Sequence, residues 1–138
     1  MWIEGLDRIQ KLRGVNFYHL NYMVADTKRW EQSAAYFIDT HKAVKSFVKN
    51  SSLGFAIPYL HNGQMHDFMP DFIIRLNSVE ERYLILETKG YDPLKEVKEA
   101  AAKRWKNAVN ADGKFGSWEF EMAEHPTAVS KILNTVLD

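Results

Sequence analysis

The sequence predicts a three-layer α/β/α domain, in which helices cover both faces of a central mixed sheet. Two long stretches carry apolar residues at the three- and four-residue spacing of a helix. Three segments with the apolar and β-branched composition of strands lie between these stretches, and a fourth strand and a short helix follow. The predicted order is therefore helix, three strands, helix, strand, helix, which places helices on both sides of one sheet.

The first helix is expected over about residues 28–49. Asp26 or Thr27 can cap it, because a side-chain oxygen at this position accepts a hydrogen bond from a free amide of the first turn. Asn50 and the residues up to Gly54 are typical of a helix end. The apolar stripe of this helix consists of Trp30, Ala34, Phe37, Ile38, His41, Val44 and Val48.

Three strands are expected next, at residues 55–60, 64–76 and 83–89. The intervening His61-Asn62-Gly63 is typical of a tight hairpin, because Asn and Gly tolerate the positive φ angles of its turn. The third strand opens with the unbroken apolar run Tyr83-Leu84-Ile85-Leu86. Such a run predicts a strand that is buried on both faces.

The second half of the chain is expected to hold a helix, a strand and a short helix. Asp92 and Pro93 begin the helix as its cap and first position, and its apolar stripe runs to about residue 110. Residues 118–122 alternate like a strand. Pro126 and Thr127 precede the last helix.

Composition narrows the range of functions. The 138 residues fit a single domain, residues 1–138, in which residues 1–25 carry only a weak extended pattern. Eighteen basic and eighteen acidic residues cancel, so binding of nucleic acid through the net charge of the whole domain is not supported, while a local basic face stays open. The absence of cysteine excludes disulfides and thiolate chemistry. No signal-peptide pattern and no run of about 18 apolar residues is present, so we expect a cytoplasmic protein without a membrane partner.

The stretch that indicates chemistry is Pro70-Asp71, followed after fifteen residues by Glu87-Thr88-Lys89. Glu87 and Lys89 are two apart on a strand and point the same way. Asp71 lies on the preceding strand of a hairpin, so its carboxylate can meet that of Glu87 at one edge of the sheet. Carboxylate oxygens are the ligands that Mg²⁺ prefers, and the Thr88 carbonyl can add another oxygen.

An ordinary structural interpretation stays open beside this one. Asp71 can be a turn residue, and Glu87 and Lys89 can form a surface pair. Against that, the strand that carries Glu87 is apolar enough to be central. Charges at the end of a buried strand indicate either a functional group or a buried pair.

These residues resemble the PD-(D/E)xK nuclease superfamily, and within it the C-terminal endonuclease domain of the restriction subunit of type III restriction–modification enzymes. The resemblance covers roughly residues 24–110. The resemblance rests on five sequence segments and on residues of the next helix. The segments are Trp30-Glu31-Gln32-Ser33-Ala34-Ala35, Val48-Lys49-Asn50, Gly54-Phe55-Ala56-Ile57-Pro58-Tyr59, Pro70-Asp71-Phe72-Ile73 and Glu87-Thr88-Lys89-Gly90, and the helix residues are Lys98, Ala100, Ala101, Ala102 and Trp105.

The resemblance implies a restriction-endonuclease-like fold and a Mg²⁺-dependent endodeoxyribonuclease, with Mn²⁺ as a substitute. It makes Asp71 and Glu87 metal ligands and Lys89 the catalytic lysine, acting on double-stranded DNA. Glu31 is a weaker candidate ligand, since an acid on the first helix completes the metal site in some members of the superfamily. A favourable interaction with the helix dipole explains the same residue.

Type III restriction subunits also carry an ATP-driven motor, and its phosphate-binding loop is absent from this sequence. The resemblance therefore implies an excised domain or a stand-alone relative, with ATP used only by a separate motor domain. A DNA methyltransferase subunit is the other implied partner. Two alternatives stay open: a non-catalytic module of the same fold that binds DNA or a protein, and a repair or junction-resolving nuclease.

Other charged residues give weaker signals. Lys95, Lys98 and Lys106 share one face of the second long helix and can follow a phosphate backbone, although a solvated face is the more common explanation of such a pattern. The group His61, His66 and Asp67 matches no metal-ligand spacing. His41 is expected to be a core histidine whose ring nitrogens are hydrogen-bonded.

Overall fold

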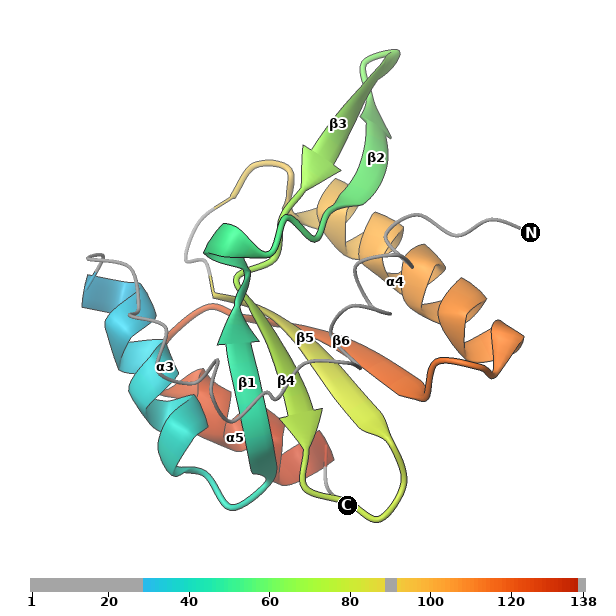
Figure 1. Cartoon of the computed structure of the whole chain (residues 1–138). Coiled ribbons are helices and arrows are strands. Elements are labelled where there is room, and N and C mark those ends of the chain that lie inside the picture. Colours follow the sequence, from blue (N-terminus) through green and yellow to red (C-terminus); the bar gives the residue numbers. More distant parts are fainter. Residues whose placement is uncertain (1–28, 89–91, 137–138) are drawn as a thin grey trace.

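The computed structural model describes residues 29–88 and 92–136, without the side chains of residues 29–32 and Ser52. This part of the chain is a mixed α/β structure (Figure 1). Its elements in chain order are α3 (Arg29–Thr40), β1 (Val44–Lys49), the 3-10 turn η1 (Asn50–Ser52), β2 (Ile57–His61), β3 (Gln64–Phe68), β4 (Phe72–Leu76), β5 (Arg82–Thr88), α4 (Lys95–Asp112), β6 (Ser117–Ala123) and α5 (Ala128–Val136).

The main sheet has four strands in the order β1-β4-β5-β6. β4 pairs antiparallel with both β1 and β5, whereas β5 and β6 are parallel, so the sheet is mixed. β2 and β3 form a separate two-stranded hairpin that projects from one end of the main sheet (Figure 1). Its turn has positive φ at Asn62 and Gly63, as the sequence predicts.

Helices cover both faces of the main sheet. On one face α4 and the base of the hairpin pack against Ile73, Tyr83 and Ile85. On the other face α3 and α5 pack against Ile74 and Leu84. Successive side chains of β5 therefore enter different cores, and the predicted burial of this strand on both faces is confirmed.

The prediction of one helix over residues 28–49 is wrong in its second half. The helix ends at Thr40, and residues 44–49 form the edge strand β1. Val44 and Val48 fit the spacing of a helix, but in β1 a register shift between Val44 and Ser46 places them in different cores. Their β-branched side chains favour the strand once it can pair with β4.

The predicted strand over residues 64–76 is in fact two strands, because the chain leaves the hairpin at Met69 and enters the main sheet at Phe72. Pro70 between them has no amide hydrogen to offer a ladder. The other strands and the last two helices lie within a few residues of their expected places. The predicted start of α4 is wrong, because its cap is Leu94 and its first residue is Lys95, and Asp92 instead accepts a hydrogen bond from the Leu94 amide in the turn before it.

Some expectations fall outside the described residues. They concern residues 1–25 and the capping role of Asp26 or Thr27. The side chain of Trp30 is likewise outside the description. None of the helices in the two described ranges has both the length and the apolar character needed to cross a bilayer.

Candidate active site

Asp71 and Glu87 lie opposite each other where β4 and β5 meet the hairpin. The register pairs Phe72 with Leu86, so Asp71, one residue before Phe72, falls beside Glu87, one residue after Leu86. Asp71 lies just before β4, so the continued register places its backbone beside that of Glu87. The structure thus makes Asp71 and Glu87 neighbours at one sheet edge, while the convergence of their carboxylates stays a prediction.

The carboxylate of Asp71 is fixed to the end of β5. Its Oδ2 atom accepts a hydrogen bond from the Thr88 amide at 2.9 Å and another from the Thr88 hydroxyl at 2.7 Å. Within the described residues both bonds go to Oδ2, which leaves Oδ1 for a ligand. Thr88 therefore acts on the site through its amide and hydroxyl, while the role of its carbonyl stays a prediction.

Asn50 holds the backbone on which Asp71 sits, and it is 2% exposed. Its side-chain amide donates to the carbonyls of Phe55 at 2.7 Å and Pro70 at 2.9 Å. Its side-chain oxygen accepts from the Phe55 amide at 3.0 Å, and its own backbone amide donates to the Asp71 carbonyl at 2.8 Å. The sequence indicated Asn50 as a helix end and as part of one segment of the resemblance, and gave no sign of these contacts.

Glu87 is 2% exposed and faces the side of the sheet that α4 covers, as do Tyr83 and Ile85. A buried carboxylate is costly unless a positive charge lies near it. On this side α4 carries Lys98, and the charge of Glu87 helps to raise the pKa of Lys98, after the stronger effects of Asp92 and Tyr59.

Lys98 points into the molecule and is not a freely solvated lysine. Its side chain is 13% exposed, and its ammonium lies 2.7 Å from Asp92 Oδ2 and 5.7 Å from the ring centre of Phe68. Burial alone lowers the pKa of Lys98, but the hydrogen bond and charge of Asp92, helped by Tyr59 and Glu87, raise it above its ordinary value. Lys98 is therefore a cation at neutral pH beside the candidate site.

The other two lysines of the predicted DNA-binding face are paired with carboxylates. Lys95 lies against Glu124, and Lys106 lies 3.6 Å from Glu119. The hydrogen bond from Lys95 raises its own pKa and lowers the pKa of Glu124. Exposed pairs of this kind are weak, so a phosphate can displace a carboxylate, and DNA contact by these lysines stays a prediction.

Two predicted residues fall outside the described part of the site. Lys89 follows directly after β5, and the side chain of Glu31 belongs to the first turn of α3. Among the described residues there is no group of three or more His, Asp or Glu side chains placed to hold a metal ion. The described carboxylates of the site are therefore the opposed pair Asp71 and Glu87.

The histidines named in the sequence analysis contact neighbouring residues of the fold. His61 and His66 lie on the hairpin, where the ring of His66 stacks on Tyr59 with centroids 5.4 Å apart. His41 lies in the turn after α3 and is only partly buried, so its predicted core position is wrong. Both of its ring nitrogens are nevertheless bonded, as expected: Nδ1 accepts from the Ala43 amide, and Nε2 lies 2.8 Å from Asn134 Oδ1.

Comparison with known proteins gives no information on the function of this chain. No protein-family model, no curated protein and no solved structure matches this chain. The functional proposal therefore depends on the placement of Asp71 and Glu87 and on the groups that hold them.

Proposed function

We propose that this chain is a Mg²⁺-dependent endodeoxyribonuclease domain with a restriction-endonuclease-like fold, of the kind found in type III restriction subunits. The observation that carries the proposal is the placement of Asp71 beside the buried Glu87, with Asp71 Oδ2 anchored on Thr88. A turn residue or a simple surface pair needs neither the anchoring nor the burial. A metal site needs both, since its ligands must be held in a fixed geometry.

The donor set fits a hard divalent cation. Asp71 and Glu87 offer carboxylate oxygens and, within the described residues, no sulfur or imidazole ligand accompanies them. Oxygen ligands of this kind select Mg²⁺ or Mn²⁺ over zinc or copper. When bound, the cation would polarise a phosphate and make water more acidic.

Residues of the chain would bind the cation, balance charge in the site and position the attacking water. Asp71 and Glu87 would hold the cation, and Lys98, which Asp92 fixes by an ion pair, would oppose the charge of the buried Glu87. Lys89 is proposed to orient the attacking water through its ammonium group. The water oxygen would bond to phosphorus as the bond from phosphorus to the leaving sugar oxygen breaks. The water proton would go to solvent, and the leaving oxygen would gain one.

Metal binding is the first test of this proposal. Calorimetry with Mn²⁺ and Mg²⁺ should give one binding event in the wild type, weakened at least about tenfold in Asp71→Asn and in Glu87→Gln, the equivalent of about 1.4 kcal/mol. The matched control is Glu119→Gln, which changes an exposed acid of the neighbouring strand β6. Equal binding by all four proteins would refute the metal site.

Cleavage is the second test, and it separates the nuclease from a non-catalytic module. Metal-dependent nicking of supercoiled plasmid should be lost in Lys89→Ala, while metal binding persists, because a group that acts in the transition state affects turnover more than ligand binding. The assay includes the proposed motor domain and methyltransferase subunit in one arm. Nicking by Lys89→Ala at the wild-type rate would remove the lysine from the mechanism.

A further inference from the structure

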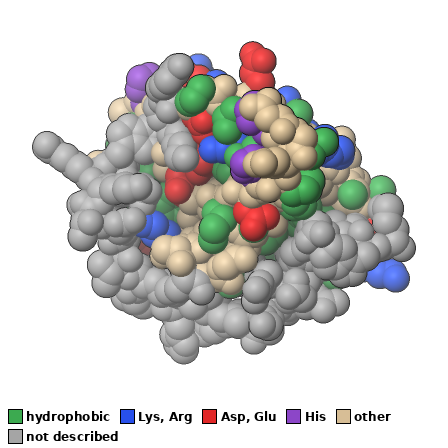
Figure 2. Space-filling view, turned by 90° about the horizontal axis from the view of Figure 1, so that it is seen from above, with side chains coloured by type: hydrophobic (Ala, Val, Ile, Leu, Met, Phe, Trp, Pro, Cys, Tyr) green, Lys and Arg blue, Asp and Glu red, His purple; other side chains and the backbone are tan. Residues whose placement is uncertain are grey.

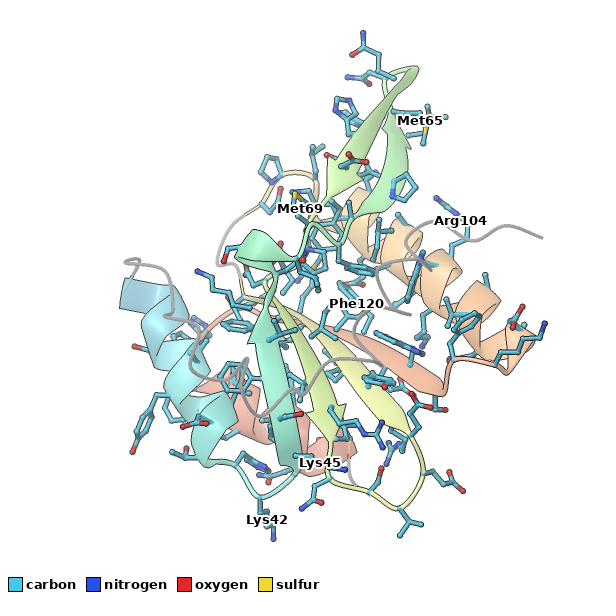
Figure 3. The ribbon with its side chains drawn as sticks, viewed as in Figure 1. Lys42, Lys45, Met65, Met69, Arg104 and Phe120 are labelled. Atoms are coloured by element: carbon cyan, nitrogen blue, oxygen red, sulfur yellow. The ribbon has the colours of Figure 1, made fainter. Side chains whose placement is uncertain are left out.

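The β2–β3 hairpin is the most prominent projection of the described structure (Figure 1). Its base is fixed in the core, where Ile57, Tyr59 and Phe68 are buried and the ring of Phe68 packs edge-on against Phe120 with centroids 5.9 Å apart. Beyond this base the side chains reach solvent. Figure 3 shows Met65 far out along the hairpin and Met69 at its base.

The exposed part presents two different faces. On one face Leu60 and Met65 form a directly opposed apolar pair, 60% and 65% exposed. On the other face His61 is opposed to Gln64, and His66 follows with its ring stacked on Tyr59. Figure 2 looks onto this end of the molecule and shows histidine, acidic, basic and apolar side chains close together.

The dimensions of the hairpin match a groove of duplex DNA. Four residue steps separate the buried Phe68 from Gln64, and at about 3.3 Å a step they span about 13 Å. The major groove is about 8.5 Å deep and about 12 Å wide, and it admits a two-stranded ribbon. The hairpin therefore reaches the base edges from a base that stays outside the groove.

The chemistry of the hairpin favours base edges over phosphates. Residues 57–68 contain no lysine or arginine and one exposed acid, Asp67, so the phosphate contacts of a bound duplex would come from other elements. His61 and Gln64 offer hydrogen-bond donors and acceptors, as base edges require, and Met65 and Leu60 offer apolar contact for thymine methyl groups.

The hairpin is also directly connected to the candidate active site. Its second strand ends at Phe68, and only Met69 and Pro70 separate it from Asp71. Asn50 fixes this connection by bonding the Pro70 carbonyl and, through its backbone amide, the Asp71 carbonyl. A ligand held by the hairpin is thus held at a fixed position relative to Asp71 and Glu87.

We infer that the β2–β3 hairpin enters the major groove of duplex DNA and so positions a phosphate at the Asp71–Glu87 end of the sheet. This inference rests on the proposed nuclease function for its choice of DNA as the ligand. The hairpin holds the duplex, and the sheet end carries the chemistry. Its residues contact the DNA bases and take no part in bond cleavage.

The test is anisotropy of a short fluorescein-labelled duplex of mixed sequence, without divalent metal. The variant His61→Ala/Gln64→Ala keeps the Asn62-Gly63 turn and the buried base, so it should fold as the wild type does, with an unchanged thermal midpoint. We expect its duplex affinity to fall at least about tenfold, as the loss of one good base contact implies. The major-groove ligand methyl green should displace the wild-type chain, and the minor-groove ligand netropsin should not.

The control is Val79→Ser, which changes a fully exposed apolar residue in the β4–β5 loop at the opposite end of the sheet. Its duplex affinity should equal that of the wild type. Unchanged binding by the hairpin variant, displacement by netropsin alone, or a wild-type preference for single-stranded DNA would overturn the inference. Failure of the nuclease proposal has a different signature: duplex binding through the hairpin with no Mg²⁺ or Mn²⁺ binding by calorimetry.

Discussion

At the scale of single residues, the Thr88 hydroxyl is predicted to stabilise the fold through the charge of Asp71. Thr88→Val keeps the shape and β-propensity of the side chain but removes the 2.7 Å bond to Asp71 Oδ2. Hydrogen bonds to charged groups contribute about 1.5–3 kcal/mol, and the Thr88 amide remains, so we expect a loss of about 1–2 kcal/mol in urea denaturation. Thr135→Val, which removes an exposed bond back to the Lys131 carbonyl, should change stability little. Equal effects of the two variants would contradict this account.

A second residue, Glu121 on β6, gives a pH-dependent prediction. Desolvation of its carboxyl, with the charges of Glu119 and Glu99, raises its pKa above the ordinary 4.5, although Lys106 and Lys103 oppose this. An acid whose folded pKa is raised destabilises the fold when it is ionised. Glu121→Gln should therefore be more stable than the wild type at pH 8.

The stability advantage of Glu121→Gln should shrink as the pH falls through the raised pKa of the folded state. It should be gone below 4.5, where the acid is neutral in both states. Urea denaturation at pH 8 and at pH 4 measures the difference. An advantage of the same size at both pH values would show that packing, and not charge, causes it.

The sequence predicted part of the site at this scale. The pairing of Asp71 with Glu87 followed from strand-like segments joined by short turns, because a hairpin register is set by its turn. The contacts of Asn50 and Thr88 could not be predicted, since they depend on three segments meeting at one point. Asn50 also lay at the end of a wrongly predicted helix, which concealed its position between β1 and the site.

At the scale of elements, the connection between β1 and β2 is predicted to depend on Asn50. Asn50→Ala leaves the Phe55 amide and the carbonyls of Phe55 and Pro70 without their partner in a buried setting. Each unsatisfied buried group costs about 1–3 kcal/mol, so we expect a total loss of about 2–4 kcal/mol after relaxation. Asn107→Ala on the exposed side of α4 is the control and should leave stability unchanged or slightly raised. An effect of Asn50→Ala below about 1 kcal/mol, which is the contribution of one ordinary hydrogen bond, would contradict this role.

Helices and strands could be predicted where the apolar residues follow a single spacing, either that of a helix or that of a strand. Residues 95–112 carry a helical stripe that no strand pattern imitates, and α4 lies there. Residues 44–49 carry their apolar side chains at 44, 47 and 48, which is helical spacing, and pairing with β4 overrides this pattern, which is a tertiary effect. The hairpin was recognised from Asn62-Gly63, whose φ angles the structure confirms.

At the scale of the whole molecule, the central strands connect two hydrophobic cores. Leu84 and Ile85 are adjacent in β5 and fully buried, but Leu84 packs in the core with α3 and α5, whereas Ile85 packs in the core with α4. Neither core has a sheet of its own. We therefore expect the described structure to unfold as one cooperative unit.

Hydrogen exchange tests this cooperativity with Leu84→Ala and Ile85→Ala. Each substitution removes a fully buried side chain from a close-packed core, which costs about 2–5 kcal/mol. In a single unit, amides of α4 around Trp105 and Val109 exchange only by global unfolding, so Leu84→Ala should speed their exchange although Leu84 lies on the opposite face of the sheet. Ile85→Ala, on the α4 side, is the matched comparison and should speed it to a similar degree. If α4 kept its wild-type protection in Leu84→Ala and lost it only in Ile85→Ala, the two cores would be independent, and the sheet edge that carries Asp71 and Glu87 would depend on each of them separately.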